Sequence, residues 1–147
     1  MADANWKVDT SGGTITLLST DLNSLANNTG VLGAARSAEA FLYADLELNV
    51  TFGTNPTANS LVEVYLVRAI DGTNYEDTTT AATAAGPANG FVGGFPVRAV
   101  TTAQRIALPK VELPAMDYKW MVINKTGQTM AASGNTLIMK RYTEQAV

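Results

Sequence analysis

Residues 40–52 have the sequence Ala-Phe-Leu-Tyr-Ala-Asp-Leu-Glu-Leu-Asn-Val-Thr-Phe, and this stretch decides the fold class. Every even position is apolar, whereas the odd positions from residue 45 onward are Asp, Glu, Asn and Thr. Successive side chains of a β-strand point to opposite faces of the sheet. This period of two therefore predicts a long antiparallel strand with one buried face and one solvated face.

Other stretches rich in β-branched and aromatic residues predict further short strands, separated by turn-forming residues. They span residues 14–18, 61–68, 91–97, 105–108, 111–113, 117–123 and 136–142. About eight strands at short spacing, without alternating helices, predict an all-β fold, namely a single-domain antiparallel β-sandwich or jelly roll. The turn formers in residues 53–60 predict that strands 40–52 and 61–68 pair as a hairpin with a long connection.

Two segments lie outside the predicted strands. Residues 1–13 are polar and end in Ser-Gly-Gly, so we predict an extended N-terminal arm at 1–13 and a β-sandwich domain at 14–147. Residues 76–90 consist largely of Thr, Ala and Gly, and we predict a surface loop there. Neither segment has enough apolar side chains to fix its own conformation against backbone entropy. We therefore expect both to be mobile in a free subunit and to be ordered by neighbouring chains.

The composition excludes several classes of chemistry. Among the 147 residues there is no His and no Cys, which rules out a Ser-His-Asp triad, His-ligated zinc and thiolate chemistry. The net charge is −3, with 10 basic and 13 acidic residues and no basic cluster, so a nucleic-acid partner is not expected. The N-terminus lacks the pattern of a signal peptide, and no apolar run is long enough to span a membrane. We expect a protein made in the cytoplasm, with no cofactor and no metal.

Two groups of acidic residues could carry chemistry but have simpler explanations. Asp45 and Glu47 lie two apart on one strand face, roughly 7 Å from each other. That spacing would suit a glycosidase, but the alternation favours a solvated outer face. Asp71, Glu76 and Asp77 could bind a cation, yet they lack the spacing of a calcium loop. We interpret them as a polar hairpin tip.

Aromatic residues leave two alternatives open. Tyr118 and Trp120 share one face of a predicted strand, and Tyr142 lies on a strand that we expect to be its neighbour. Exposed rings in this arrangement could stack on sugars and form a carbohydrate-binding platform. Large aromatic side chains more often pack inside a β-sheet protein. Exposure of Tyr118 and Trp120 would favour carbohydrate binding, and burial would favour a structural role.

Four segments, taken in order along the chain, carry a family resemblance. They are residues 65–75 (Tyr-Leu-Val-Arg-Ala-Ile-Asp-Gly-Thr-Asn-Tyr), 94–98 (Gly-Phe-Pro-Val-Arg), 123–128 (Ile-Asn-Lys-Thr-Gly-Gln) and 133–137 (Ser-Gly-Asn-Thr-Leu). Their order resembles small virion structural proteins of tailed bacteriophages, over residues 61–142 approximately. The resemblance implies a β-sandwich that coats or cements the head, or that belongs to the neck or tail. It implies no catalytic residue.

The sequence and this resemblance together lead to one functional expectation and one alternative. We expect a non-enzymatic capsid decoration or cement protein that binds the outside of the head shell and stabilises it. Its partners would be the major capsid protein and further copies of itself, with a trimer favoured, and its location would be the virion. The expected partner contacts are Trp6, Val8, Phe91 and Phe95. The alternative is a neck or tail module with host-surface carbohydrate as its ligand.

Overall fold

The computed structural model describes residues 4–10 and 13–146 of the chain. Within these residues there are nine strands and one short 3-10 helix, η1 (Thr20–Leu22). The strands are β1 (Ala4–Val8), β2 (Ile15–Leu18), β3 (Gly30–Leu32), β4 (Tyr43–Val50), β5 (Leu61–Ala69), β6 (Phe91–Pro96), β7 (Gln104–Glu112), β8 (Asp117–Lys125) and β9 (Thr136–Ala146).

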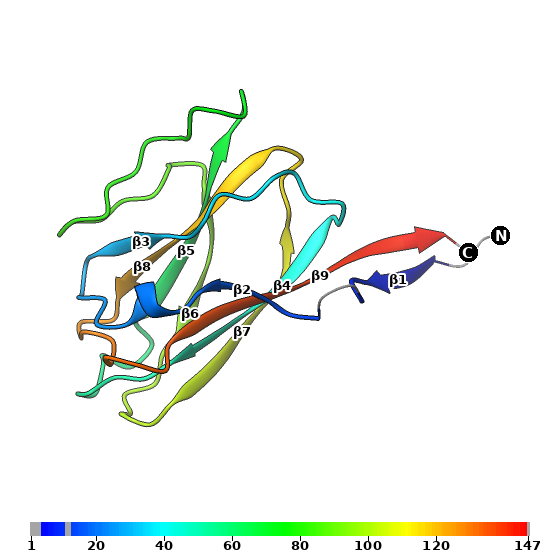
Figure 1. Ribbon diagram of the computed structural model, residues 1–147. Coiled ribbons are helices and arrows are strands. Elements are labelled where there is room, and N and C mark those ends of the chain that lie inside the picture. The colour runs from blue at the N-terminus through cyan, green and yellow to red at the C-terminus, as the bar shows by residue number, and fades with distance from the viewer. Residues whose placement is uncertain (1–3, 11–12, 147) are drawn as a thin grey trace.

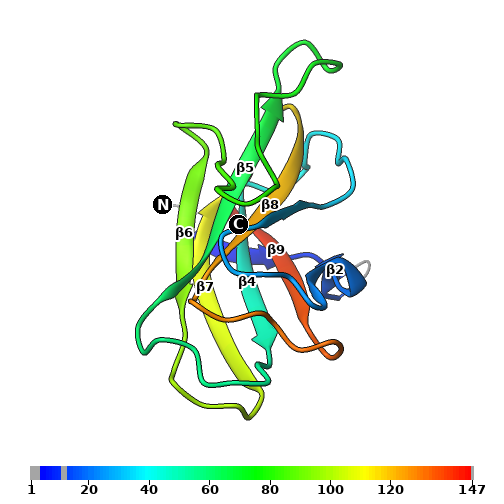
Figure 2. The same ribbon diagram turned by 90° about the vertical axis from the view of Figure 1, so that its left-hand side faces the viewer.

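The strands form two antiparallel sheets that face each other (Figure 1 and Figure 2). The first sheet has the order β1-β9-β4-β7, with β2 also paired to β9. The second sheet has the order β3-β8-β5-β6. Every strand pair is antiparallel. The predicted fold class, an all-β antiparallel β-sandwich, is therefore confirmed.

Strand β4 has the two faces that its sequence predicts. Its even-numbered residues Ala44, Leu46, Leu48 and Val50 are completely or almost completely buried between the sheets. Its odd-numbered residues face away from this core and are exposed or half-buried. Because each buried Leu or Val contributes about 1.5–3 kcal/mol relative to an exposed one, this inner face stabilises the sandwich strongly.

The predicted hairpin between strands 40–52 and 61–68 is wrong. Strand β4 pairs with β7 and β9, whereas β5 pairs with β6 and β8 in the other sheet. The connection therefore crosses from one sheet to the other, and Phe52 at its start is buried in the core. Both strands have an apolar face, and they cover these faces by packing across the sandwich instead of pairing edge to edge.

The loop at residues 76–90 packs on the outer face of the second sheet. Thr79 and Ala85 form an isolated bridge, and the amide of Ala84 donates a hydrogen bond of 2.9 Å to the carbonyl of Asn28. The Ala84 side chain is buried against Met121 and Ile123. The expectation from the sequence is that this loop has too few apolar side chains to fix its own conformation; it packs nonetheless, because the second sheet also has apolar side chains on its outer face that a small residue such as Ala84 can cover.

Candidate functional site

Strands β1 and β9 form a two-stranded ribbon that projects from the sandwich (Figure 1). The pairing runs from Ala4 opposite Ala146 to Val8 opposite Tyr142, and the pairing of β9 with β4 ends at Tyr142. Beyond Tyr142, β9 therefore pairs only with β1 among the described strands. All five residues of β1 are exposed. The predicted arm at 1–13 is thus a paired strand over residues 4–8, while residues 1–3 and 11–12 lie outside the described residues.

A buried ionic network fixes the root of this ribbon. The amide of Asp9 donates to the carbonyl of Arg141 at 2.9 Å, and the Arg141 guanidinium pairs with the Asp9 carboxylate. Arg141 also donates to Glu39, which accepts hydrogen bonds from Tyr118 Oη at 2.6 Å and from Arg36 Nε at 2.9 Å. Asp9 and the Glu39 side chain are almost fully buried. The network joins the ribbon to β8 in the opposite sheet.

The network also favours the charged forms of Glu39, Arg36 and Arg141. Burial alone would raise the pKa of Glu39, but the hydrogen bonds from Tyr118, Arg141 and Arg36 outweigh it and hold this pKa below its ordinary value. Burial opposes the charge of Arg36 and Arg141, yet hydrogen bonds to Glu39 raise the pKa of both. Burial and the Glu39 carboxylate together raise the pKa of Tyr118. Glu39 is therefore the shared anion of this network.

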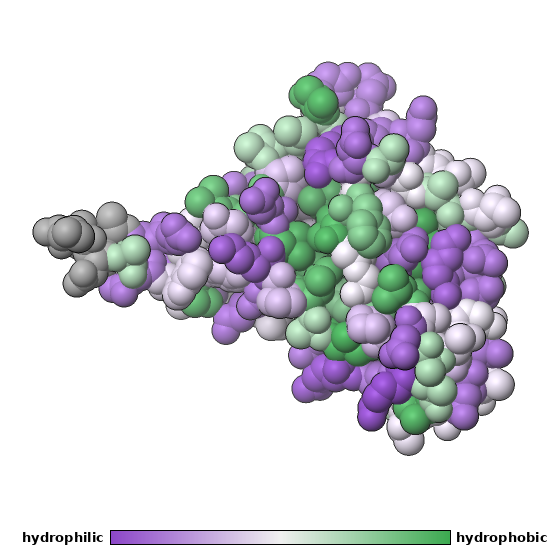
Figure 3. Space-filling model, turned by 180° about the vertical axis from the view of Figure 1, so that it is seen from behind, coloured by the Kyte–Doolittle hydropathy of each residue, from purple (hydrophilic) through white to green (hydrophobic). Residues whose placement is uncertain are grey.

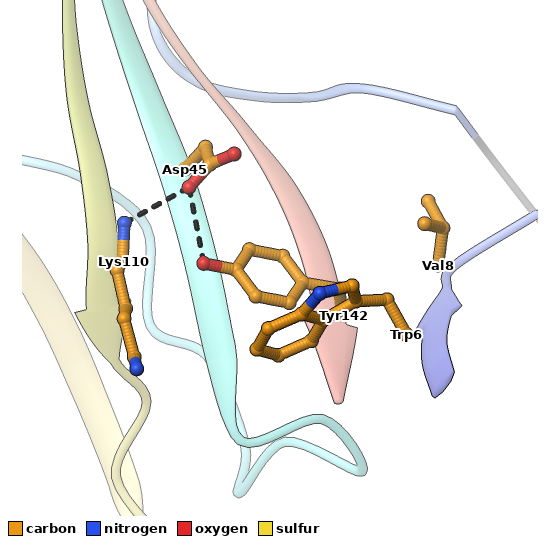
Figure 4. A pocket seen from close by; sticks show the side chains of 5 residues that line it. All are labelled: Trp6, Val8, Asp45, Lys110 and Tyr142. Atoms are coloured by element: carbon orange, nitrogen blue, oxygen red, sulfur yellow. Dashed lines mark hydrogen bonds between the residues drawn. The ribbon is translucent and has the colours of Figure 1, made fainter. Parts of the chain in front are cut away.

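A pocket lies on the outer face of the first sheet, where the ribbon joins the sandwich (Figure 4). It has a volume of about 360 Å³ and is lined by Trp6 and Val8 of β1, Asp45 of β4, Lys110 of β7 and Tyr142 of β9. We call it the aromatic pocket. Figure 3 shows the molecule from behind, tapering toward the ribbon, with hydrophobic residues gathered over the middle of the body beside the base of the ribbon.

The rings of Trp6 and Tyr142, with Val8, form the apolar side of this pocket. The Tyr142 ring meets the Trp6 ring edge to face, with a centroid distance of 5.3 Å and an interplanar angle of 85°. On its other side Tyr142 lies 5.8 Å from the ring of Tyr43. Trp6 is 56% exposed. A large apolar ring is therefore presented to solvent while its neighbours hold it in place.

Asp45 and Lys110 form the polar side. Asp45 Oδ1 accepts hydrogen bonds from the backbone amide of Lys110 at 2.9 Å and from Tyr142 Oη at 3.2 Å. The pairing of β4 with β7 has a bulge opposite Asp45, where Lys110 has a φ of 53°. The Lys110 Nζ lies 5.3 Å from the ring centroid of Tyr43. No described residue donates a hydrogen bond to Asp45 Oδ2, so this oxygen faces solvent as an acceptor.

The structure places the four expected partner contacts at different positions. Trp6 and Val8 are exposed on the ribbon, at 56% and 40%. Phe91, at the start of β6, is also exposed and meets the ring of Tyr65 edge to face. Phe95 is completely buried in the core, so its assignment as a partner contact is wrong. The alternation of β6 turns Phe95 inward, opposite Val62.

The other candidate residues are explained by local structure. Tyr118 and Trp120 are buried, which confirms the interpretation as core residues and removes them as a carbohydrate platform. Tyr142 lies in the opposite sheet from Tyr118, so the expectation that their strands are neighbours is wrong. The aromatic pocket was missed because it joins residues 6, 45, 110 and 142, which lie far apart in the sequence. The one available signal was the outward face of residues 40–52, which carries both Tyr43 and Asp45.

Asp45, Glu47, Asp71 and Glu76 each have a partner in the described part of the chain. Glu47 pairs with Arg105 at 3.3 Å on the solvated outer face. Asp71 accepts hydrogen bonds from the amides of Asn74 and Thr73 at a turn, and these bonds lower its pKa to about 2. Glu76 accepts a hydrogen bond from the amide of Arg68. Over residues 4–10 and 13–146, no three acidic side chains gather as a metal site.

The described part of the chain contains no helix of the length and apolarity that crossing a membrane requires. No known protein family matches this chain, and no curated protein matches it in sequence.

Several solved structures have a similar arrangement of strands. The CBM36-1 domain of a multidomain xylanase from the hindgut metagenome of Trinervitermes trinervoides is 11% identical, with a TM-score of 0.44 over 94% of this chain and 96% of that domain. The N-terminal cellulose-binding domain of Cellulomonas fimi β-1,4-glucanase C is 14% identical, with a TM-score of 0.36 over 95% and 82%. At this identity and TM-score the similarity concerns strand arrangement alone.

Proposed function

We propose that this chain is a non-enzymatic structural protein of a tailed-phage virion that decorates or cements the outside of the head shell. Two features support the proposal. One is the set of four sequence segments whose order along the chain resembles that of small virion proteins. The other is the projecting ribbon of β1 and β9. The ribbon is the observation that carries it. Its projecting part, β1 with residues 142–146 of β9, adds no residue to the core clusters, yet the buried network at its root fixes where it projects.

The ribbon is suited to join one protein chain to another. Among the described strands, β1 is the last one on its side of the sheet, so its outer edge has backbone donors and acceptors that no described strand pairs. Such an edge can pair with a strand of another chain. On a capsid, many symmetry-related copies would bind at once, so a modest affinity per copy becomes effective through multivalency. The proposed partners are the major capsid protein and sister copies, with a trimer favoured, and the proposed location is the virion.

The proposed contacts are the exposed apolar residues Trp6 and Val8 of the ribbon and Phe91 of the second sheet. A single large aromatic residue commonly supplies much of the binding energy of an interface. Replacing Trp6 with Ala should therefore remove a large part of the affinity for the capsid.

The experiment deletes residues 1–8 and measures binding to heads from which the protein has been stripped. The truncated domain should fold, because every residue of β1 is exposed and Asp9, which pairs with Arg141, is retained. Its binding should be lost or strongly reduced. The control is Ile70→Ser, which changes an 84% exposed apolar residue outside the ribbon and should leave binding unchanged. Unchanged binding by the truncated protein, or its failure to fold, would contradict the proposal.

The second candidate function is a neck or tail module that binds host-surface carbohydrate. The exposed aromatic pocket favours it, although the burial of Tyr118 and Trp120 favours the structural role. The copy number in purified virions separates the two locations. Quantitative mass spectrometry should find hundreds of copies per virion for a head decoration protein and only a handful for a neck or tail module.

A further inference from the structure

We propose that the aromatic pocket binds the pyranose ring of a neutral saccharide, with Trp6 as the stacking surface and Asp45 and Lys110 as the polar contacts. This inference rests on the second candidate function, because it takes carbohydrate as the class of ligand. It adds the site at which the carbohydrate would bind. It competes with the assignment of Trp6 and Val8 as capsid contacts, because both residues line the pocket and one surface cannot be covered by capsid and sugar at once.

The aromatic side of the pocket fits the apolar face of a sugar ring. Trp6 is more than half exposed, and its contact with Tyr142 restricts the motion of the indole. Tyr142 is in turn supported by Tyr43. Rings that are already ordered lose little side-chain entropy on binding. The C–H groups of a pyranose can therefore pack on a preformed surface, as amphipathic ligands do on exposed Trp and Tyr.

The polar side provides one acceptor and one donor for hydroxyl groups. The two hydrogen bonds to Asp45 Oδ1 orient the carboxylate and leave Oδ2 without a donor from any described residue. A sugar hydroxyl can donate to this oxygen, and the Lys110 ammonium can donate to a sugar oxygen. The bulge in β7 places the backbone amide of Lys110 beside Asp45, while the Lys110 side chain runs away from Asp45 and its ammonium lies 5.3 Å from the ring centroid of Tyr43 (Figure 4).

The size and charge of the pocket narrow the class of ligand. Its volume of about 360 Å³ is within the range of small-molecule sites, which begins near 300 Å³. One carboxylate and one ammonium line it, so it has no excess of positive charge for a phosphate or sulfate. The Asp45 carboxylate would repel an acidic sugar. A neutral hexose satisfies both polar groups without burying an unpaired charge.

The chain contains its own probe for this site. Of the two tryptophans, Trp6 is 56% exposed and Trp120 is 1% exposed, so ligand-dependent changes in emission and in acrylamide quenching report on Trp6. The full chain is titrated separately with hexaoses of glucose, mannose and galactose at millimolar concentrations. We expect a saturable change in emission with at least one of them, together with protection of Trp6 from acrylamide.

Three variants test the assignment by calorimetric titration with the same hexaoses. Asp45→Asn keeps an acceptor for Lys110 and Tyr142 but replaces the free oxygen with an amide, and should weaken binding about tenfold with no change in fold. Trp6→Ala should abolish binding. Phe91→Ala is the matched control, because Phe91 is an equally exposed aromatic residue in edge-to-face contact with a tyrosine but does not line the pocket, and it should bind like the unchanged chain.

Several results would overturn the proposal. These are no response to any of the hexaoses, equal affinity of Asp45→Asn and the unchanged chain, or a preference for polygalacturonate over the neutral sugars. If Asp45→Asn no longer binds stripped heads but binds the hexaoses as well as the unchanged chain does, Asp45 contacts the capsid protein and not a sugar. If a chain present at hundreds of copies on the head binds saccharide, the pocket assignment stands, and both the neck or tail location and the role of Trp6 and Val8 as capsid contacts are refuted.

Discussion

Glu39 should contribute more to stability than any exposed carboxylate of the chain, and Glu39→Gln tests this. The Glu39 carboxylate, 3% exposed, accepts hydrogen bonds from Tyr118, Arg36 and Arg141. The substitution keeps the shape of the side chain but removes the charge that compensates two arginines. Breaking a buried ion pair from one side costs about 3–5 kcal/mol.

Two features of the structure make the expected cost of Glu39→Gln smaller than about 3–5 kcal/mol. Arg141 keeps its pairing with Asp9, and the side chains of Arg36 and Arg141 are 24% and 19% exposed, so both guanidiniums still reach water. We therefore expect a loss of about 2 kcal/mol, which lowers the melting temperature of a chain of this size by about 4–8 °C. The matched control is Glu47→Gln. Glu47 also pairs with an arginine, but this pair is 35% and 72% exposed and should contribute less than about 1 kcal/mol.

The loss of stability caused by Glu39→Gln should become smaller as the pH falls. The folded-state pKa of Glu39 lies below its unfolded value, which is about 4.3 for a free glutamate. Its contribution is therefore fully present above that value and is lost as the pH falls through the lower, folded pKa. The stability difference between the unchanged chain and Glu39→Gln should be largest at neutral pH and should close in acid. Urea unfolding, followed by circular dichroism along a pH series, measures it.

Two outcomes would refute this reasoning. If Glu39→Gln at neutral pH costs no more than Glu47→Gln, the buried network does not stabilise the ribbon root. If the difference between the unchanged chain and Glu39→Gln stays constant into acid, the ionised carboxylate is not its source.

Three further predictions concern the core, the loop and metals. Leu48→Asp should unfold the domain, because it places a charge at a fully buried position. Asp45→Asn, on the outer face of β4, should change stability by less than about 1 kcal/mol. Thermal melts that reverse this order would contradict the assignment of the two faces of β4. A Cβ at Gly86 would collide with the ring of Tyr65, so Gly86→Ala should cost about 1–3 kcal/mol in urea unfolding, whereas Gly53→Ala meets no neighbouring atom and should cost less. Treatment with a chelator should leave the melting temperature unchanged, since the chain has no His or Cys, and a fall of several degrees would refute this.

The sequence by itself determined the class of fold and the faces of its main strand. Alternation is a local property, because neighbouring side chains on a strand always point to opposite sides of the sheet. Residues 40–52 could therefore be assigned an inner and an outer face without knowing which strands lie beside them. The same local reasoning, together with the tendency of large aromatic side chains to pack inside, placed Tyr118 and Trp120 in the core.

Only the tertiary structure decided which strands are neighbours and what their outer faces bring together. Pairing depends on how two apolar sheets cover each other, and turn formers at residues 53–60 permit either a hairpin or a crossing between the sheets. The aromatic pocket and the network at the ribbon root each join residues more than 90 positions apart, such as Asp45 with Tyr142 and Glu39 with Arg141. No local pattern encodes such contacts, because they exist only once β9 lies between β1 and β4.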